Sequence, residues 1–180
     1  MFRWSAFGLC ASIGLFIASA GAVQAQEDGL LAHDINGFAL DMTVEQVTSL
    51  ANAPLVPAGG GQYKAKVDGI NYNFGFSAQG HLFRVDSRQE LGPFTPDANF
   101  ANALTERLAS KFGPPQANQL PDGPAFWKFQ EAYTDAKGQQ LNRETESLLV
   151  MLTGKKGVSL AVEMMLMDLR IQRRDAGKAN

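Results

Sequence analysis

Few residues of this chain have the types and spacing that chemistry requires. Its 180 residues include two histidines, His33 and His81, and one cysteine, Cys10. A zinc site needs three or four close His, Cys or carboxylate ligands, and no spacing here supplies them. We therefore expect neither a metal nor another cofactor, and we interpret His81 as a solvated turn residue.

The sequence also lacks the usual motifs of nucleophilic and acid–base catalysis. No Gly-x-Ser-x-Gly elbow occurs, and Gly59–Gly61 lacks the Lys-Ser/Thr pair that completes a phosphate-binding loop. Asp86 and Glu90 lie on a predicted strand, and because Arg84 and Arg88 share it, ion pairs are the expected role of these carboxylates. The sequence predicts a protein that is not an enzyme. A hydrolase with an unfamiliar site is the least favoured alternative.

The first 25 residues have the pattern of a secretory signal. Arg3 gives a short positive start, residues 6–22 form an apolar run, and residues 23–25 offer small side chains for cleavage. The run is shorter than the ~20 apolar residues that a membrane span needs. We expect residues 1–25 to be a signal peptide and residues 26–33 a flexible leader. The mature protein would be periplasmic or secreted, without stable membrane insertion.

Charge and cysteine content limit the remaining classes. Removing Arg3 from the 16 Lys and Arg residues leaves 15 against 18 acidic residues, a net charge of −3. A nucleic-acid binder would need a clustered basic face, so we expect no nucleic-acid partner. The basic residues between 170 and 178 lie near the end of the chain, where we expect residues 171–180 to form a frayed tail. Without Cys10 the mature chain has no cysteine, so its stability must come from the core.

The clearest element is a helix predicted over residues 96–112. Thr95 can cap its start, and Gly113, which precedes two prolines, can end it. One apolar stripe, which would face a core, consists of Phe100, Leu104 and Leu108.

A similar order of elements precedes this helix. Thr43 and Gln46 have the spacing of a capping box, which predicts a short helix that Pro54 ends. Strand-like runs follow at 63–67, 70–76 and 81–91. Asp68-Gly69, between the first two runs, favours a tight hairpin turn.

After the clearest helix the order repeats. Residues 125–133, 146–153 and 158–170 read as strands, with a polar loop over 134–142. One helix followed by three antiparallel strands thus occurs twice, as a repeat of pattern without residue identity. We expect an α+β fold in which two such units, 34–92 and 93–170, pack as one domain.

The last two predicted strands are apolar on both faces. Two explanations remain open: the second face packs on the first half of the chain, or it is exposed and receives a partner, because thioether side chains adapt to varied surfaces. Tyr and Trp on strands also suit an interface. The candidate partner-binding residues are Trp127, Tyr133, Leu149, Met151, Met165, Met167 and Leu169.

Two segments resemble a known family. Residues 35–47, INGFALDMTVEQV, are similar to the "I-x-G-(hydrophobic)-x-L-G-M-(S/T)-x-E-(E/Q)-V" opening of small bacterial periplasmic proteins, including beta-lactamase-inhibitor-like modules, with Asp41 where that pattern usually has Gly. Residues 108–115, LASKFGPP, resemble the helix ending "L-x-x-K-(Y/F)-G-x-P" of uncharacterised members. The resemblance implies a tandem module of the binding, inhibitory or envelope-assembly kind, whose antiparallel sheet offers a surface to another protein. It assigns no functional residue.

These observations favour an exported, non-enzymatic protein that binds an envelope or secreted protein of unknown identity through its sheet. The alternative is a periplasmic carrier of a small molecule or lipid, in which the sheet and helices enclose an apolar pocket.

Overall fold

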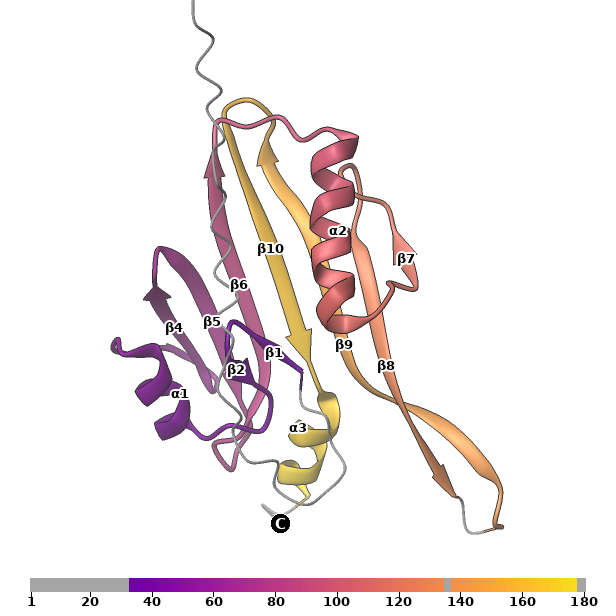
Figure 1. The fold of residues 1–180 in the computed structure, drawn as a ribbon. Coiled ribbons are helices and arrows are strands. Elements are labelled where there is room, and N and C mark those ends of the chain that lie inside the picture. Colours follow the sequence, from indigo (N-terminus) through magenta and orange to yellow (C-terminus); the bar gives the residue numbers. More distant parts are fainter. Residues whose placement is uncertain (1–32, 135–136, 178–180) are drawn as a thin grey trace, which may run out of the picture.

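The computed structural model describes residues 33–134 and 137–177 and has an α+β fold (Figure 1). Its helices are α1 (Val44–Ala51), α2 (Ala98–Phe112) and α3 (Leu169–Ala176). Its strands are β1 (Asp34–Ile35), β2 (Phe38–Ala39), β3 (Val56–Gly59), β4 (Gln62–Val67), β5 (Ile70–Phe76), β6 (Leu82–Gly92), β7 (Ala117–Asn118), β8 (Ala125–Thr134), β9 (Gln140–Lys155) and β10 (Ser159–Met167). None of the helices in these residues is long and apolar enough to cross a membrane.

One antiparallel sheet of eight strands organises the molecule. Its spatial order is β3-β4-β5-β6-β10-β9-β8-β7, so the strands that follow α1 and those that follow α2 meet where β6 pairs with β10. The prediction of three strands after each helix is wrong, because four follow each one. The strands missed are β3 and β7, short and exposed edge strands whose residues read as loop in the sequence.

The helix α1 begins as its capping box predicts. The backbone N–H of Thr43 donates to Gln46 Oε1 at 2.8 Å, and the backbone N–H of Gln46 donates to Thr43 Oγ1 at 3.4 Å. The helix ends at Asn52, whose φ of 46° lies in the left-handed region. Val47 and Ala51 are buried, so this helix packs one side against the sheet.

The helix α2 confirms the element predicted over 96–112, with a different cap. The backbone N–H of Phe100 donates to Asp97 Oδ1 at 2.8 Å, so Asp97 and not Thr95 caps the start. Gly113 ends the helix with a φ of 75°. The residues it buries include Leu104 and Leu108 of the predicted stripe.

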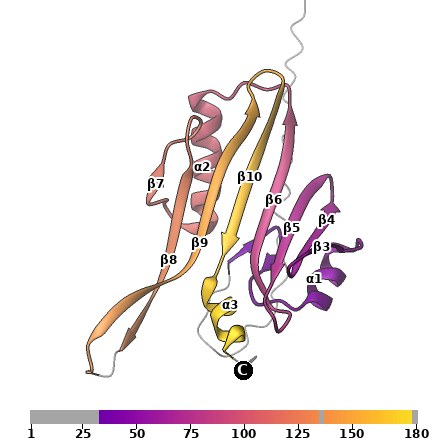
Figure 2. The same cartoon turned by 180° about the vertical axis from the view of Figure 1, so that it is seen from behind.

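The helices cover one face of the sheet and leave the other open. Side chains alternate between the two faces along each strand. Phe74 of β5 and Trp127 of β8 belong to the same buried core as Val47 of α1 and Leu104 of α2, which places α1 and α2 on one face. Figure 2 shows the opposite face in front of the helices, and we call it the open face.

The chain after β10 differs from its prediction. A strand was predicted to continue to residue 170 and the tail over 171–180 to be frayed, yet β10 ends at Met167 and α3 follows. Asp168 caps this helix by accepting from the backbone N–H of Arg170 at 2.8 Å. Ile171 and Asp175 are buried, so α3 packs on the body. Residues 178–180 and the predicted signal peptide lie outside the described residues, as does the leader up to residue 32.

The hairpin of β8 and β9 extends beyond the rest of the sheet (Figures 1 and 2). Residues 134–142 were predicted to be a polar loop, but β8 reaches Thr134 and β9 begins at Gln140. The outermost pairs join Gln130–Thr134 to Gln140–Glu144. We call these two segments the arm.

Candidate functional site: the open face of the sheet

A cluster of apolar side chains lies on the open face across three strands. Met165 of β10 is paired with Leu149 of β9, which is paired with Phe126 of β8. Alternation places these side chains on the face opposite the buried Leu166, Leu148 and Trp127. Each member of the cluster is half-buried. We call it the methionine patch, and it consists of Phe126, Leu149, Met151, Met165 and Met167.

The sequence left two explanations for the second apolar face of these strands: packing on the first half of the chain, or exposure to a partner. The position of the methionine patch favours exposure. On the side opposite the core, four of its residues keep part of their surface accessible: Leu149, Met151, Met165 and Met167. The inward side of the same strands, with Val162, packs in the core. Sequence reasoning missed Phe126, although its position between the inward Ala125 and Trp127 is the alternation signal that would have found it.

A row of charged residues borders the patch on β6. Arg84 Nε lies 2.9 Å from Asp86 Oδ1, and Arg88 Nε lies 2.7 Å from Glu90 Oε1, which confirms the ion pairs predicted for these carboxylates. Arg88 also pairs with Glu163 of β10. Hydrogen bonds to Glu90 and Glu163 raise the pKa of Arg88, so its guanidinium stays cationic. The row therefore contains both guanidinium and carboxylate groups, and these form ion pairs with one another.

The patch and the charged row meet in a concave pocket of about 230 Å³. Met165 and Leu149 line one side of it. Arg84, Asp86 and Arg88 line the other. The pocket is amphipathic and suits a side chain that is apolar with a polar end.

The structure places three other candidate residues elsewhere. Trp127 is 1% exposed, and its Nε1 donates to the carbonyl of Gly113 at 2.8 Å. It belongs to the core, so its selection as a partner-binding residue is wrong. Leu169 is 39% exposed but begins α3 and does not share a strand with Met167. The side chain of Tyr133 lies outside what the structure describes.

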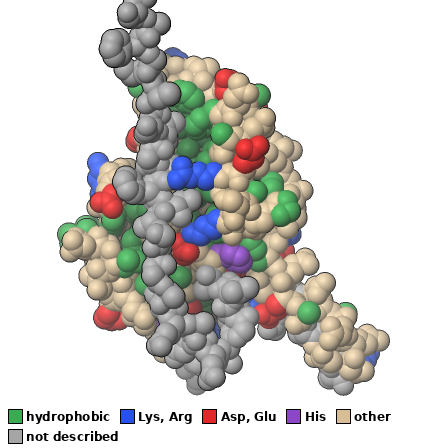
Figure 3. All heavy atoms as spheres, in the orientation of Figure 1, with side chains coloured by type: hydrophobic (Ala, Val, Ile, Leu, Met, Phe, Trp, Pro, Cys, Tyr) green, Lys and Arg blue, Asp and Glu red, His purple; other side chains and the backbone are tan. Residues whose placement is uncertain are grey.

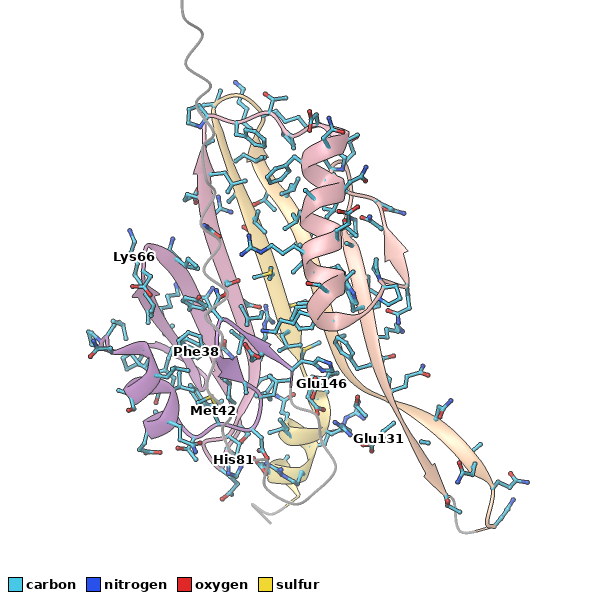
Figure 4. The ribbon with its side chains drawn as sticks, viewed as in Figure 1. Phe38, Met42, Lys66, His81, Glu131 and Glu146 are labelled. Carbon is cyan, nitrogen blue, oxygen red and sulfur yellow. The ribbon has the colours of Figure 1, made fainter. Side chains whose placement is uncertain are left out.

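His81 lies in a cluster of polar side chains and not free in solvent, contrary to its prediction. Its Nδ1 is 2.8 Å from Oδ2 of the buried Asp175 on α3. Ser77 Oγ donates to the same oxygen at 2.5 Å. Arg174 donates to Asp175 at 2.8 Å and to Asp41 at 2.7 Å. Figure 4 shows His81 at the end of the molecule that α3 occupies.

This cluster joins α3 to the segments that carry Ser77, His81 and Asp41. Burial by itself raises the pKa of Asp175, but hydrogen bonds from Arg174, Ser77 and His81 outweigh it and hold the pKa well below its usual range. The Ser77 hydroxyl donates to the carboxylate and not to the imidazole, so the three side chains do not form a nucleophile–base relay. Asp41 has a φ of 69°, in the left-handed region that Gly adopts without strain.

His33 is held in a second pair on the helix-covered side, although it was predicted to lie in a flexible leader. Its Nδ1 lies 2.6 Å from Oε2 of the buried Glu146, and its ring stacks on Phe129 with centroids 3.7 Å apart. Figure 4 shows Glu146 between β1 and α3. No group of three or more His, Cys, Asp or Glu residues within 33–134 and 137–177 could hold a metal ion.

Charges on the helix-covered side are dispersed. Figure 3 shows its Lys, Arg, Asp and Glu side chains mixed with polar and hydrophobic surface and not gathered by sign. Two basic residues near the C-terminus are paired with acids: Arg170 Nη1 lies 3.1 Å from Glu131 Oε1, and Arg174 Nη2 lies 2.7 Å from Asp41 Oδ1. The described residues visible on this side do not form a basic cluster of the kind that nucleic-acid binding requires.

Comparisons with protein-family models, curated proteins and solved structures found no match.

Proposed function

We propose that this chain is an exported, non-enzymatic protein that binds another protein through the open face of its sheet, with the methionine patch at the centre of the contact. The observation that carries the proposal is the position of this patch. By alternation from the buried residues of the same strands, its five apolar side chains lie on the face opposite the core. Soluble proteins that expose such patches use them for contacts with other molecules.

The support beneath the patch favours a specific contact. Leu148, Val150 and Leu166 are fully buried directly behind it, so the strands that carry the patch are fixed. A rigid sheet loses little conformational entropy on binding. Methionine side chains on that rigid base can adapt to the shape of the partner.

The charged row would orient the partner. Its carboxylates and guanidiniums satisfy one another in the free protein, and a partner residue that enters the pocket would exchange one of these pairs for its own. Such polar contacts at the rim contribute more to specificity than to affinity. The partner would be an envelope or secreted protein, because residues 1–25 have the pattern of a signal peptide.

The resemblance to periplasmic tandem modules supports the same function. It implies a sheet surface offered to another protein, and the open face is the surface of this kind that the chain provides. The alternative, a carrier of a small molecule or lipid, has the amphipathic pocket in its favour. Its volume of about 230 Å³ is below the ~300 to 1,000 Å³ of typical ligand sites.

Site-specific photo-crosslinking in cells tests the proposal. A photoreactive residue at Met165 should form a covalent adduct of one discrete mass with a second protein. The matched control places the same residue at Val158, which is 59% exposed and lies in the turn before β10. We expect no adduct there. The same adduct at both positions, or none at Met165, contradicts the proposal.

A variant sharpens this experiment. With the photoreactive residue at Leu149, the double substitution Met165→Asp/Met167→Asp should abolish the adduct while the protein stays folded, because two carboxylates would have to be buried in the contact. Native mass spectrometry separates the carrier alternative: a bound small molecule in freshly purified protein that M165D/M167D displaces would favour the carrier.

A further inference from the structure

The methionines of this chain have two kinds of surroundings. The sequence has six, and those among the described residues are Met42, Met151, Met164, Met165 and Met167. Met42 and Met164 pack against the hydrophobic core. The other three belong to the methionine patch, and each keeps part of its surface accessible on the open face. Three of the five described thioether groups therefore lie together on one open surface.

The two methionines outside the patch have protected sulfur atoms. The backbone N–H of Ala39 donates to Met42 Sδ at 3.3 Å, and this bond engages the lone pair that an oxidant attacks. Met164 lies opposite the buried Val150 of β9, so alternation directs its side chain to the covered face. Contact with the core restricts access to both thioether groups.

The patch methionines lie close to one another and to the charged row. Met151 of β9 lies opposite Glu163 of β10, and Met165 lies opposite Leu149. Met151 and Met165 are therefore diagonal neighbours, and such positions are about 7 to 8 Å apart, within reach of long side chains. Both methionines line the concave pocket together with Arg88. Because this pocket lies on the open face, a small oxidant can reach the sulfur atoms.

We propose that Met151, Met165 and Met167 form a reversible oxidation site that controls the contact made by the open face. Hydrogen peroxide is the oxidant: its O–O bond breaks, one oxygen atom bonds to the thioether sulfur through a sulfur lone pair, and water leaves. A methionine sulfoxide reductase reverses the step, because two thiols become a disulfide and the oxygen leaves as water. The inference rests on the proposed function, since the contact that it regulates is the one assigned to the methionine patch.

Oxidation changes what the patch offers to a partner. A sulfoxide is polar and accepts hydrogen bonds, so burying it in an apolar contact without a donor is unfavourable. The free protein has donors nearby. Arg84 lies opposite Met167 on the neighbouring strand, and its ion pair with Asp86 is made through Nε. A guanidinium carries five N–H groups, so the terminal nitrogens of Arg84 can donate to a sulfoxide oxygen. Oxidation therefore stabilises the unbound state relative to the complex.

Peptide mass spectrometry of the purified protein during treatment with hydrogen peroxide tests the site. Each patch methionine should gain one oxygen atom several-fold faster than Met42 and Met164. In guanidinium chloride this difference should disappear, because unfolding removes the contacts that protect Met42 and Met164. Equal rates at all five positions of the folded protein, or a difference that persists after unfolding, overturn the inference.

Photo-crosslinking in cells from a photoreactive residue at Leu149 tests the regulation. Treatment with hydrogen peroxide, continued until mass spectrometry shows the patch to be oxidised, should abolish the adduct of the parent. Met151→Leu/Met165→Leu/Met167→Leu should keep its adduct, because leucine has a similar volume and no thioether. Met42→Leu is the matched control and should lose the adduct as the parent does.

The outcomes separate this inference from the proposed function. An adduct that survives in the oxidised parent contradicts the regulation and leaves the proposed function intact. Loss of the adduct in the triple leucine variant also contradicts the regulation, because the oxidation that matters then lies elsewhere. Absence of an adduct in the untreated parent contradicts the proposed function, and the regulation with it.

Discussion

The pairing of β6 with β10 divides the sheet into a first part, β3 to β6, and a second part, β7 to β10. The two parts are alike on the covered face and differ on the open face. On the covered face, Phe74 of the first part and Trp127 of the second are both fully buried in one core. On the open face, β6 carries paired charges such as Arg84 and Asp86, whereas β9 and β10 carry Leu149 and Met165. Packing constrains the covered face in both parts. The open face is not constrained in this way, so it is where the two parts can differ in function.

The edges of the two parts differ as well. In the second part, β8 and β9 extend beyond the other strands of the sheet and form the arm (Figure 2). The strands of the first part form no such extension. The second part therefore has two features that the first lacks: an apolar patch on the open face and the arm. We propose that the methionine patch is a contact surface for another protein.

The largest effect is expected where the two parts are alike. Phe74→Ala and Trp127→Ala each remove a fully buried aromatic side chain, and each should lower the free energy of unfolding by about 3 to 5 kcal/mol. Urea unfolding followed by circular dichroism measures this loss. Phe126→Ala, on the half-buried open face, is the control and should cost much less. If unfolding showed two transitions and each variant shifted a different one, the two parts would unfold separately.

The next effect concerns α3. This helix follows β10 of the second part and contacts Ser77 and His81 of the first part. Asp175→Asn replaces the carboxylate that accepts from Arg174, Ser77 and His81, and should cost about 2 to 3 kcal/mol at neutral pH. Thermal unfolding at pH 7 measures the change. Arg173→Gln, an exposed residue on the same helix, is the control. Equal stability of both variants would contradict the role of the cluster.

The same carboxylate predicts a dependence on pH. Because the pKa of Asp175 is lower in the folded protein than its ordinary value of 3.8, its contribution is complete above that value. It is lost as the pH falls below 3.8 toward the folded pKa. The parent should therefore lose more stability than Asp175→Asn between pH 5 and pH 2. Parallel curves for the two proteins would exclude this linkage.

A smaller effect is expected on the open face. Met165→Asp/Met167→Asp should change the free energy of unfolding by less than about 1 kcal/mol per site, because both side chains are half-buried and no described helix covers them. Differential scanning calorimetry measures it. A loss as large as that of Trp127→Ala would place these side chains in the core and break the contrast between the two faces.

The smallest effect is expected in the charged row. Arg88→Gln removes partly exposed ion pairs with Glu90 and Glu163, which contribute about 0.5 kcal/mol. The difference from the parent should shrink further in high salt, because exposed charges are screened. A loss that is unchanged by salt would indicate that Arg88 acts through packing.

Much of the local structure could be predicted from the sequence. The start of α1, the end of α2 and the turn between β4 and β5 follow from the capping box, Gly113 and Asp68-Gly69. These signals act between neighbouring residues, so they are readable without the fold. The strands β5, β6 and β8 were found to within a residue at each end, because their side chains alternate clearly.

The sequence by itself also determined that β9 and β10 would have two apolar faces, because alternation assigns each residue to a side. Only the tertiary structure decided which side is covered. The pairing of β6 with β10 joins segments far apart in the chain, and it places Trp127 inward and Met165 outward. The burial of Asp175 likewise depends on contacts with residues far away in the chain, Ser77 and His81. Local patterns carry no information about such contacts, because the energy that selects them comes from burial against elements elsewhere in the chain.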